Sequence, residues 1–281
     1  MKFHHFGDPD GAPLVFFHGM PSSGDEAELL HEAAKQQGVH VLAPDRPGFG
    51  ATAFDPDRTL MSTARQVAEA LRQMGYARYA VAGCSGGGPY TFALAAVAPE
   101  AVHFAAPIAG IYPFQGWRAL TGMHWNNRVV FYLAQKRPRW IRLLFNITLT
   151  RLRQDENKAY FDSLKLLPPE DAAYFSQPAV ATIMQRALRN SMQQGNEGAI
   201  LETQLFARQW DIDSQLICCP LIAWHGERDT AVPVRLAQAY FDATAANRSA
   251  VYQLIRLPTA HISTLAEVIE SNTFWQGVKT A

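Results

Sequence analysis

Runs of apolar residues alternate with amphipathic stretches along the first 110 residues of the chain. The runs are short and rich in β-branched and aromatic residues, as in strands that are buried within a sheet. The amphipathic stretches carry apolar residues at helical spacing, and glycine follows two of them, as it follows many helices. The predicted strands cover residues 2–6, 13–19, 39–45, 79–83 and 102–110. The predicted helices between them cover residues 22–38, 59–74 and 88–100. Because the strands are nearly continuous in apolar residues, the pattern indicates a mostly parallel sheet with helices on both faces.

The alternation breaks at Ile111 and resumes near Asp213. Between these points the chain shows no convincing strand pattern and several helical patterns, which prolines separate. These helices are predicted over 117–136, 139–151, 155–165, 178–194 and 196–209. Beyond the break, strands are predicted over 220–226 and 251–258, and helices over 234–245 and 264–277. The simplest interpretation is one α/β core, formed by 1–110 and 214–281, that carries an all-helical cap over 111–213 after about its sixth strand.

The composition is that of an ordinary globular protein, with 48% hydrophobic and 18% charged residues among 281. Lysine plus arginine equals aspartate plus glutamate at 25 each, so the net charge gives no reason to expect nucleic acid as a partner. The three cysteines are an odd number and two are adjacent, which disfavours a disulfide framework and favours a reducing compartment. The N-terminal residues lack the apolar segment of a secretory signal, and no apolar run is long enough to span a bilayer. We therefore expect a cytoplasmic protein that uses no metal and no cofactor.

The segment GCSGGG at 83–88 follows a predicted strand and precedes a predicted helix. It has the spacing G-x-S-x-G, with Ser85 between Gly83 and Gly87. A serine on a sharp strand-to-helix turn adopts a strained backbone, and a Cβ two residues to either side would collide there. The alternatives are a phosphate-binding loop and a flexible turn, but neither G-K-[S/T] nor the dinucleotide-binding spacing is present. The pattern therefore favours a nucleophilic serine at the positive end of the next helix.

A serine nucleophile needs a base and a group that orients the base. In the chain order that accompanies a G-x-S-x-G turn, an acid and then a histidine follow the serine. Asp229 lies in the loop after the first strand beyond the break, and His261 lies in the loop after the last strand. Because ligand sites form at the carboxyl ends of parallel strands, we expect Ser85, Asp229 and His261 to lie together. Glu227 and Asp213 are the alternative acids.

Five motifs stand at the ends of the predicted strands. They are HGMP at 18–21, DRPGFG at 45–50, GCSGGG at 83–88, GERDTAVP at 226–233 and AHIS at 260–263. With these motifs the chain resembles the α/β-hydrolase fold superfamily, and the resemblance covers nearly the whole chain outside the predicted cap. It implies that Ser85 is the nucleophile, His261 the base and Asp229 the orienting acid. It also implies an oxyanion hole formed by the backbone N–H groups of Gly86 and Met20.

Two departures narrow the chemistry that the resemblance implies. The loop HGMPSSG lacks the H-G-G-G stretch of one group of lipases and esterases, which favours the branch with a helical cap. The nucleophile is serine, whereas haloalkane dehalogenases and epoxide hydrolases of this fold use aspartate, so both chemistries are disfavoured. A serine hydrolase that cleaves a small ester or related acyl compound is therefore implied. The alternatives are C–C bond hydrolysis, cofactor-free peroxidation or cyanohydrin lysis on the same triad, and a ligand receptor with a slow or inactive triad.

The predicted cap includes a basic and aromatic stretch, because residues 101–154 contain no aspartate or glutamate. Its basic residues are Arg118, Arg128, Lys136, Arg137, Arg139, Arg142, Arg151 and Arg153. One interpretation is a surface that attracts anionic or lipid-like substrates, or a membrane. The favoured interpretation is a solvated face whose apolar side covers the substrate pocket. Tyr112, Phe114 and Trp117 are candidates to line that pocket, and the alternative is that they form the core of the cap.

Several other conspicuous side chains are expected to be structural. His18 and His225 each precede a glycine at the end of a strand and are expected to hold loops. Asp45 is expected to fix a turn through its carboxylate. Cys84 should point away from the site, and the pair Cys218–Cys219 should pack at the entry of a strand, because it lacks metal-ligand spacing.

Overall fold

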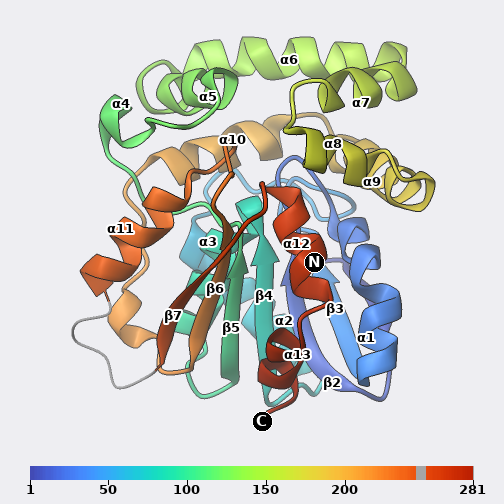
Figure 1. Cartoon of the computed structure of the whole chain (residues 1–281), viewed down its shortest axis with the longest axis vertical. Helices are drawn as coiled ribbons and strands as arrows, with labels where there is room; N and C mark the ends of the chain where they lie inside the picture. The colour runs from blue at the N-terminus through green and yellow to red at the C-terminus, as the bar shows by residue number, and fades with distance from the viewer. Residues whose placement is uncertain (245–250, 281) are drawn as a thin grey trace.

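A sheet of seven strands forms the centre of the molecule in the computed structural model, which describes residues 1–244 and 251–280 (Figure 1). The strands are β1 (Phe3–Gly7), β2 (Ala12–Phe17), β3 (Val39–Pro44), β4 (Tyr79–Cys84), β5 (Val102–Ile108), β6 (Leu221–Gly226) and β7 (Tyr252–Leu257). Their order across the sheet is β1-β3-β2-β4-β5-β6-β7. Among these described strands, β1 runs antiparallel to β3 and the other neighbours are parallel. The mostly parallel sheet that the sequence pattern predicts is confirmed.

The parallel strands end level with one another at one edge of the sheet. Cys84 of β4 pairs with Ile108 of β5, and Ile108 pairs in turn with Trp224 of β6. Gly226, which ends β6, pairs with Leu257, which ends β7. The loops that follow β4, β6 and β7 therefore emerge side by side, although they are far apart in the sequence.

Helices cover both faces of the sheet (Figure 1). One face carries α2 (Leu60–Gln73), α3 (Gly88–Val97) and α11 (Val234–Thr244), and the other carries α1 (His31–Gln37), α12 (Ile262–Ile269) and α13 (Asn272–Lys279). The apolar stripe of α2, which includes Leu60, Val67 and Leu71, is buried in the core as its helical spacing predicts. Thr59 starts this helix with a capping box, because its hydroxyl accepts from Ser62 N while Ser62 Oγ accepts from Thr59 N. The two packed layers fix the strand ends, and with them the loops at the carboxyl edge.

The helices α4 to α10 lie between β5 and β6 in the chain, and we call them the cap. They are α4 (Gly116–Ala119), α5 (Trp125–Lys136), α6 (Pro138–Gln154), α7 (Glu156–Leu164), α8 (Pro169–Phe175), α9 (Pro178–Ser191) and α10 (Glu197–Ala207). The cap stands above the carboxyl ends of the strands in Figure 1, with α10 near the sheet and α6 at the far end. A small apolar cluster that includes Tyr160, Phe175 and Val180 joins α7, α8 and α9. The cap therefore covers the edge at which the loops after β4, β6 and β7 emerge.

The structure corrects the predicted position of the cap and one of its helices. The cap follows the fifth strand, β5, rather than about the sixth. The stretch 117–136 is divided into α4 and α5 near Gly122, whose φ of 84° lies in the left-handed region that ends a helix. Pro168 and Pro169 look like a break in the sequence, but Pro169 starts α8, because the first turn of a helix needs no N–H donor at that position.

Two helices of the core also differ from the prediction. The stretch 22–38 starts as a 3-10 helix, η1 (Gly24–Leu30), and continues as α1. The stretch 264–277 is divided between α12 and α13, and residue 245 of the helix predicted over 234–245 lies outside the described residues. Within the described part of the chain, we find no helix with the length and apolar character needed to cross a membrane.

Candidate active site

Ser85 stands on a sharp turn between β4 and α3. Its φ of 51° lies in the left-handed region, which residues other than glycine rarely adopt. A Cβ on Gly83 would lie 2.4 Å from the carbonyl oxygen of Gly87, and a Cβ on Gly87 would lie 2.1 Å from that of Phe17. Neither flank can hold a side chain, which confirms the reason inferred for these two glycines. The turn places the Ser85 hydroxyl at the carboxyl edge of the sheet, beneath the cap.

Gly88 is required for a different reason. A Cβ on Gly88 would lie 2.7 Å from the Cα of Gly110, which lies just beyond the end of β5. The same two chain segments are joined by a hydrogen bond from Ile111 N to the carbonyl oxygen of Ser85, at 3.0 Å. The backbone at the start of α3 therefore packs closely against the backbone just beyond β5, and this contact also fixes the turn at Ser85.

Ser85, His261 and Asp229 lie together in the order that a catalytic triad needs. His261 Nε2 lies 2.8 Å from Ser85 Oγ, and His261 Nδ1 lies 2.6 Å from Asp229 Oδ2. The second carboxylate oxygen of Asp229 accepts from the N–H groups of Ala231 and Val232, both at 2.8 Å. The loop after β6 therefore fixes the carboxylate by its own backbone and leaves one oxygen to the imidazole.

The charges of Asp229 and His261 stabilise each other in the buried site. Burial alone would raise the pKa of Asp229, but the charge of His261 and hydrogen bonds from His225 and His261 hold it below its ordinary value. Burial alone would lower the pKa of His261, but the carboxylate of Asp229 outweighs this effect and raises it. The imidazole is thereby made a stronger base than a free histidine.

Neither alternative acid is bound to His261. Asp213 instead caps the short helix η3 (Ser214–Leu216) by accepting from Gln215 N at 2.9 Å, and Glu227 is exposed. His225 supports the Asp229 loop, because its Nε2 lies 2.7 Å from the carbonyl oxygen of Val232 and 3.3 Å from Asp229 Oδ2. The expectation that His225 holds a loop agrees with these contacts.

The loop after β2 brings the backbone of Met20 next to Gly86. A Cβ on Gly86 would lie 2.9 Å from Met20 Cβ and 3.3 Å from Met20 N. The preceding peptide is held by a buried carboxylate, because Gly19 N donates to both oxygens of Glu26 at 3.0 and 3.1 Å. Burial raises the pKa of Glu26, although the hydrogen bonds from Gly19 N and the charge of Arg46 oppose this effect. The two N–H groups that the resemblance implies as oxyanion donors thus belong to adjacent stretches of backbone.

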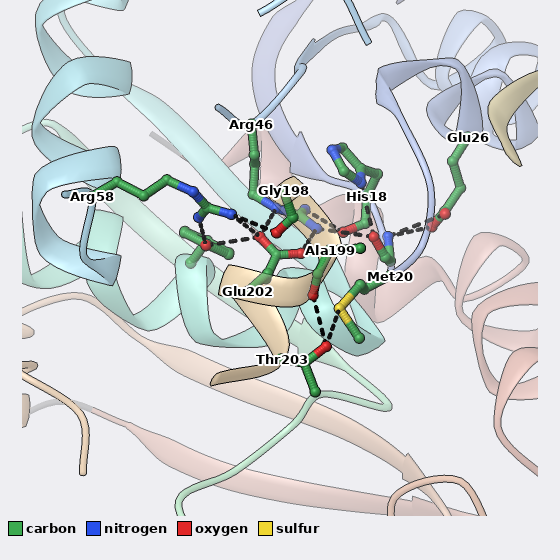
Figure 2. A network of polar contacts seen from close by, with 11 residues as sticks. His18, Met20, Glu26, Arg46, Arg58, Gly198, Ala199, Glu202 and Thr203 are labelled. Carbon is green, nitrogen blue, oxygen red and sulfur yellow. Dashed lines mark hydrogen bonds and ion pairs between the residues drawn. The ribbon is translucent and has the colours of Figure 1, made fainter. Parts of the chain in front are cut away.

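A buried cluster of charges supports this loop from behind (Figure 2). Arg46 donates to the carbonyl oxygens of residues 18 and 19, and it forms two hydrogen bonds with Glu202 of α10, at 2.8 and 2.7 Å. Glu202 also accepts from Arg58 at 3.2 Å and from the Tyr90 hydroxyl at 2.8 Å. All four side chains are fully buried, so a cap helix and two core loops share one ionic network.

The predicted substrate-lining residues make several other contacts. Tyr112 is fully buried among aromatic rings of α3 and α11 and beside the ring of His225, and Phe114 packs on Phe131 of the cap helix α5. Trp117 is exposed and lies under the guanidinium of a cap arginine. Phe206 is an apolar side chain beside the residue that follows the nucleophile, because its Cε2 lies 3.3 Å from where a Cβ on Gly86 would be.

The remaining side chains that the sequence singles out are structural, with one correction. Asp45 fixes its loop as expected, because its carboxylate accepts from Gly24 N at 2.8 Å and Ala51 N at 3.0 Å. Cys84 is buried in the core behind the sheet. Within the pair Cys218–Cys219, the second thiol is buried but the first is exposed, so packing is the wrong expectation for Cys218. In residues 1–244 and 251–280, no group of three histidine, cysteine or acidic side chains is arranged to hold a metal ion.

Sequence reasoning missed four charged residues around this site. They are Glu26, Arg46, Asp171 and Glu202. Glu202 carries a weak signal, because it is the one charged residue between Glu197 and Arg208 in an otherwise helical and largely apolar stretch. The other three carry no comparable signal, since each looks like an ordinary loop or first-turn residue.

Comparison with known proteins relates this geometry to a family. A family model for the alpha/beta hydrolase fold matches residues 12–265. The chain is 30% identical over 93 residues to YcgS, an uncharacterized hydrolase of Bacillus subtilis (strain 168). That match covers 33% of this chain and 32% of YcgS, so it spans about a third of the curated relative.

Solved structures of the same fold cover nearly the whole chain. A bromoperoxidase from Bacillus anthracis superposes with a TM-score of 0.68 and 15% identity, over 98% of this chain and 94% of that chain. The enol-lactonase from Burkholderia xenovorans LB400 superposes with a TM-score of 0.67 and 16% identity, over 99% and 94%. At these identities the likeness concerns the fold alone.

Proposed function

Because the chain belongs to the alpha/beta hydrolase fold family, we propose that it is a serine hydrolase that cleaves a small ester or related acyl compound. The observation that carries this proposal is the continuous line of contacts from Ser85 Oγ through His261 to Asp229, with distances of 2.8 and 2.6 Å. A serine becomes an effective nucleophile when an oriented base lies within this range. The strained backbone of Ser85 supports the same role, since strain of this kind gathers at functional positions.

In the first half of the reaction, Ser85 Oγ attacks the carbonyl carbon of the substrate while its proton passes to His261 Nε2. Asp229 holds the Nδ1–H of the imidazole and stabilises the imidazolium that forms. The negative oxygen of the tetrahedral intermediate accepts hydrogen bonds from the N–H groups of Gly86 and Met20. His261 then gives its proton to the leaving alcohol as the C–O bond breaks, so the acyl group remains on Ser85.

In the second half, a water molecule takes the place of the alcohol. His261 removes a proton from the water as its oxygen attacks the acyl carbon, and the same two N–H groups bind the second oxyanion. Collapse of this intermediate breaks the bond to Ser85 Oγ, which regains its proton from His261. The products are a carboxylic acid and free enzyme.

The surroundings of the oxyanion donors favour an apolar acyl group. The side chain of Met20 lies beside them, with its Sδ 3.5 Å from Thr203 Oγ1, whose hydroxyl donates to the carbonyl oxygen of Ala199 at 2.7 Å. Phe206 of the same cap helix contributes its ring edge. Because Met20 and Phe206 are apolar, we expect esters with short apolar acyl chains to react well.

Labelling by a fluorophosphonate probe tests the nucleophile directly. We expect the wild-type protein to be labelled and Ser85→Ala to remain unlabelled at an unchanged melting temperature. Hydrolysis of p-nitrophenyl esters of graded chain length then defines the acyl group. Folded wild-type protein that is not labelled would overturn the proposal. Labelling without ester turnover would instead indicate C–C bond hydrolysis, a lyase activity or a receptor role. Halide oxidation by hydrogen peroxide in the presence of a carboxylic acid would indicate peroxidation.

A further inference from the structure

Two carboxylates of the cap are completely buried and are bound by the core. Asp171 on α8 and Glu202 on α10 both have an exposed fraction of 0%. A buried carboxylate is costly unless hydrogen bonds or opposite charges compensate it. Among the described residues, the side chains and N–H groups that donate to these two carboxylates all belong to the core. The donors include Arg46, which supports the proposed oxyanion donor, and residues 261–263, the segment that carries the proposed base.

Asp171 holds the segment that presents His261. Its Oδ2 accepts from His261 N at 3.0 Å, and its Oδ1 accepts from Ile262 N at 3.0 Å and from the N and Oγ of Ser263 at 2.8 and 2.9 Å. The first N–H groups of α12 have no partner within the helix, and His261 at its start provides no side-chain cap. A cap residue 90 positions away therefore supplies both the hydrogen bonds and the negative charge that this helix start favours.

Glu202 acts on the oxyanion loop through Arg46. The C=O of Gly19 and the N–H of Met20 belong to one planar peptide group, in which they point in opposite directions. Arg46 donates to that C=O at 2.9 Å, and His18 Nδ1 lies 2.8 Å from it, so the two side chains together fix the direction of the Met20 N–H. The planar guanidinium is itself oriented by its two hydrogen bonds to Glu202, as Figure 2 shows. One continuous path of contacts thus runs from the cap helix to the proposed oxyanion donor.

The start of α10 is also fixed on the core by close backbone contact. A Cβ on Gly198 would lie 2.4 Å from the carbonyl oxygen of Gly48, in the loop after β3. One turn further along the helix, Thr203 reaches Met20. The helix that carries Glu202 therefore lies in direct contact with the loops whose geometry the carboxylate controls.

We propose that Asp171 and Glu202 are positioning residues through which the cap completes the active site. Asp171 orients the backbone of the proposed base, and Glu202 orients the Met20 N–H through Arg46. Both roles rest on the proposed function, since they require Ser85, His261 and the oxyanion donors to act on an acyl substrate. A cap that only covered the substrate would need neither buried carboxylate.

Each carboxylate has a partly exposed acidic neighbour on its own helix that serves as a matched control. Glu202→Gln and Asp171→Asn remove the buried charges with little change in shape. Glu197→Gln on α10 and Glu170→Gln on α8 remove carboxylates that bind arginines at the surface. Ester hydrolysis and melting temperature are measured for all four variants, together with inhibition by a trifluoromethyl ketone, which forms an oxyanion when it adds to a serine.

For Glu202→Gln we expect kcat to fall about 10- to 100-fold, somewhat less than the 10²–10³ that loss of one oxyanion donor costs, with little change in KM. Affinity for the trifluoromethyl ketone should fall by the same factor. For Asp171→Asn we expect a lower kcat and a lower midpoint for the acidic limb of the pH profile, because the charge of Asp171 contributes to raising the pKa of His261. The two control variants should match the wild type.

A folded Glu202→Gln variant with wild-type kcat and inhibitor affinity would overturn the role of Glu202. A folded Asp171→Asn variant with wild-type kcat and pH profile would overturn that of Asp171. If Glu202→Gln does not fold, Arg46→Lys tests the role of Glu202, because the single ammonium of lysine cannot replace the two hydrogen bonds of the guanidinium. If Asp171→Asn does not fold, Asp171→Glu tests the role of Asp171, because the longer side chain displaces the carboxylate. Wild-type protein without labelling or turnover would instead overturn the proposed function, so the two failures are distinguishable.

A second and independent feature is the outer face of α6. Four apolar side chains follow one another at helical spacing along it. They are Trp140, Leu143, Leu144 and Ile147, with exposed fractions of 58%, 50%, 37% and 43%. The opposite face of the helix, which includes Ile141, Leu149 and Leu152, is buried within the cap. In the described structure α6 therefore has two apolar faces, of which the outer one is uncovered.

Positive charge lies beside this outer face. The exposed arginines of α6 and its start are Arg137, Arg139, Arg142, Arg151 and Arg153, of which Arg142 forms an ion pair with Glu197. Residues 101–154 contain no acidic residue, although the whole chain is balanced in charge. In Figure 1, α6 forms the end of the molecule farthest from the sheet, where no core element lies over it. Arginines beside an exposed tryptophan and aliphatic stripe are the composition of helices that lie in the surface of anionic membranes.

We infer that α6 docks on an anionic lipid surface, with its apolar stripe in the headgroup boundary and its arginines at the lipid charges. A second copy of this chain on the same face would bring two clusters of arginines together, which charge repulsion disfavours. The uncovered stripe therefore favours a membrane over the purely solvated face that the sequence alone suggests.

Co-sedimentation with vesicles tests this docking. We expect binding to vesicles of phosphatidylcholine and phosphatidylglycerol at low salt, weaker binding at high salt, and little binding to phosphatidylcholine alone. Leu143→Gln combined with Ile147→Gln should weaken binding about tenfold or more, whereas Phe161→Gln, an exposed position on α7, should not. No binding to the anionic vesicles at low salt, or equal binding by both variants, would overturn the inference. A dimer that the double variant abolishes would assign the face to a second copy instead.

Discussion

Replacement of Asp229 by asparagine is a sensitive test of the proposed triad, because the loop around this residue dictates how the asparagine must sit. In the wild type, Oδ1 accepts from the N–H groups of Ala231 and Val232, and Oδ2 lies 2.6 Å from His261 Nδ1. An asparagine has one oxygen and one NH₂ group at these two places. Either the NH₂ group faces two backbone donors, or it faces the imidazole.

The backbone donors decide between these orientations. Turning the NH₂ group toward them would leave two buried N–H groups without an acceptor, at a cost of about 1–3 kcal/mol each. The other orientation loses the bond to His261 Nδ1 and the longer contact of 3.3 Å with His225 Nε2, but His225 keeps its bond of 2.7 Å to the carbonyl oxygen of Val232, so this loss is the smaller one. The NH₂ group of Asp229→Asn should therefore face His261 Nδ1. The imidazole must then accept at Nδ1 and carry its proton on Nε2, which points at Ser85. A base with its proton in that position cannot take one from the serine, and the same change in a serine protease costs about 10⁴ in kcat, or about 5.5 kcal/mol of activation free energy.

The assay is kcat for a p-nitrophenyl ester together with the rate of fluorophosphonate labelling, since both begin with attack by Ser85. We expect both to fall by a similar factor while KM changes little. Asp213→Asn, which alters an alternative acid that caps η3, should keep wild-type rates. If folded Asp229→Asn keeps more than about a tenth of the wild-type kcat, Asp229 does not orient the base and the reasoning is refuted.

Four further predictions follow from the geometry of the site. In the pH profile of kcat/KM, the midpoint of the acidic limb should lie above pH 6.5, because Asp229 raises the pKa of His261 and only the neutral imidazole accepts a proton. A midpoint below pH 6.5 would contradict this effect of Asp229. Gly87→Ala should lower stability by about 3 kcal/mol in denaturant unfolding, because its Cβ would lie 2.1 Å from a backbone oxygen. Gly86→Ala should fold but lose about 100-fold in kcat, because its Cβ pushes the oxyanion loop away; an active variant would separate Met20 from catalysis. Tyr112→Phe should leave activity unchanged and raise stability by about 1 kcal/mol, since the buried hydroxyl has no partner in the described part of the chain.

The parts of this protein that could be predicted from sequence are those in which the physical requirement is local. A turn that excludes side chains leaves glycine at fixed distances from Ser85, so its signature is readable within five residues. Asp229 and His261 are predictable for a related reason, because parallel strands end at one edge and the order of the loops is known in advance. The same local patterns account for the sheet and for the boundaries of helices such as α2.

What could not be predicted depends on contacts between distant segments. Glu202 and Arg46 are 156 residues apart, and nothing near either one shows that the other will neutralise it. Asp171 lies on a helix whose start, at two prolines, resembles a break. Tyr112 illustrates the converse case, since an aromatic residue after a strand has the same pattern whether it faces a pocket or the core.

The ionic network around Glu202 limits how this protein can be recombined with its relatives. A hybrid that kept the core and received an α4–α10 segment lacking these two carboxylates would leave Arg46 and Arg58 buried without their counter-ion, and α12 without the carboxylate at its start. Loss of one partner from a buried pair costs about 3–5 kcal/mol, a large part of the stability of a typical domain. A transplanted helical segment that is meant to change the substrate range would therefore need carboxylates at the positions of Asp171 and Glu202. In this molecule, the helical cap and the loops of the core therefore depend on each other for stability.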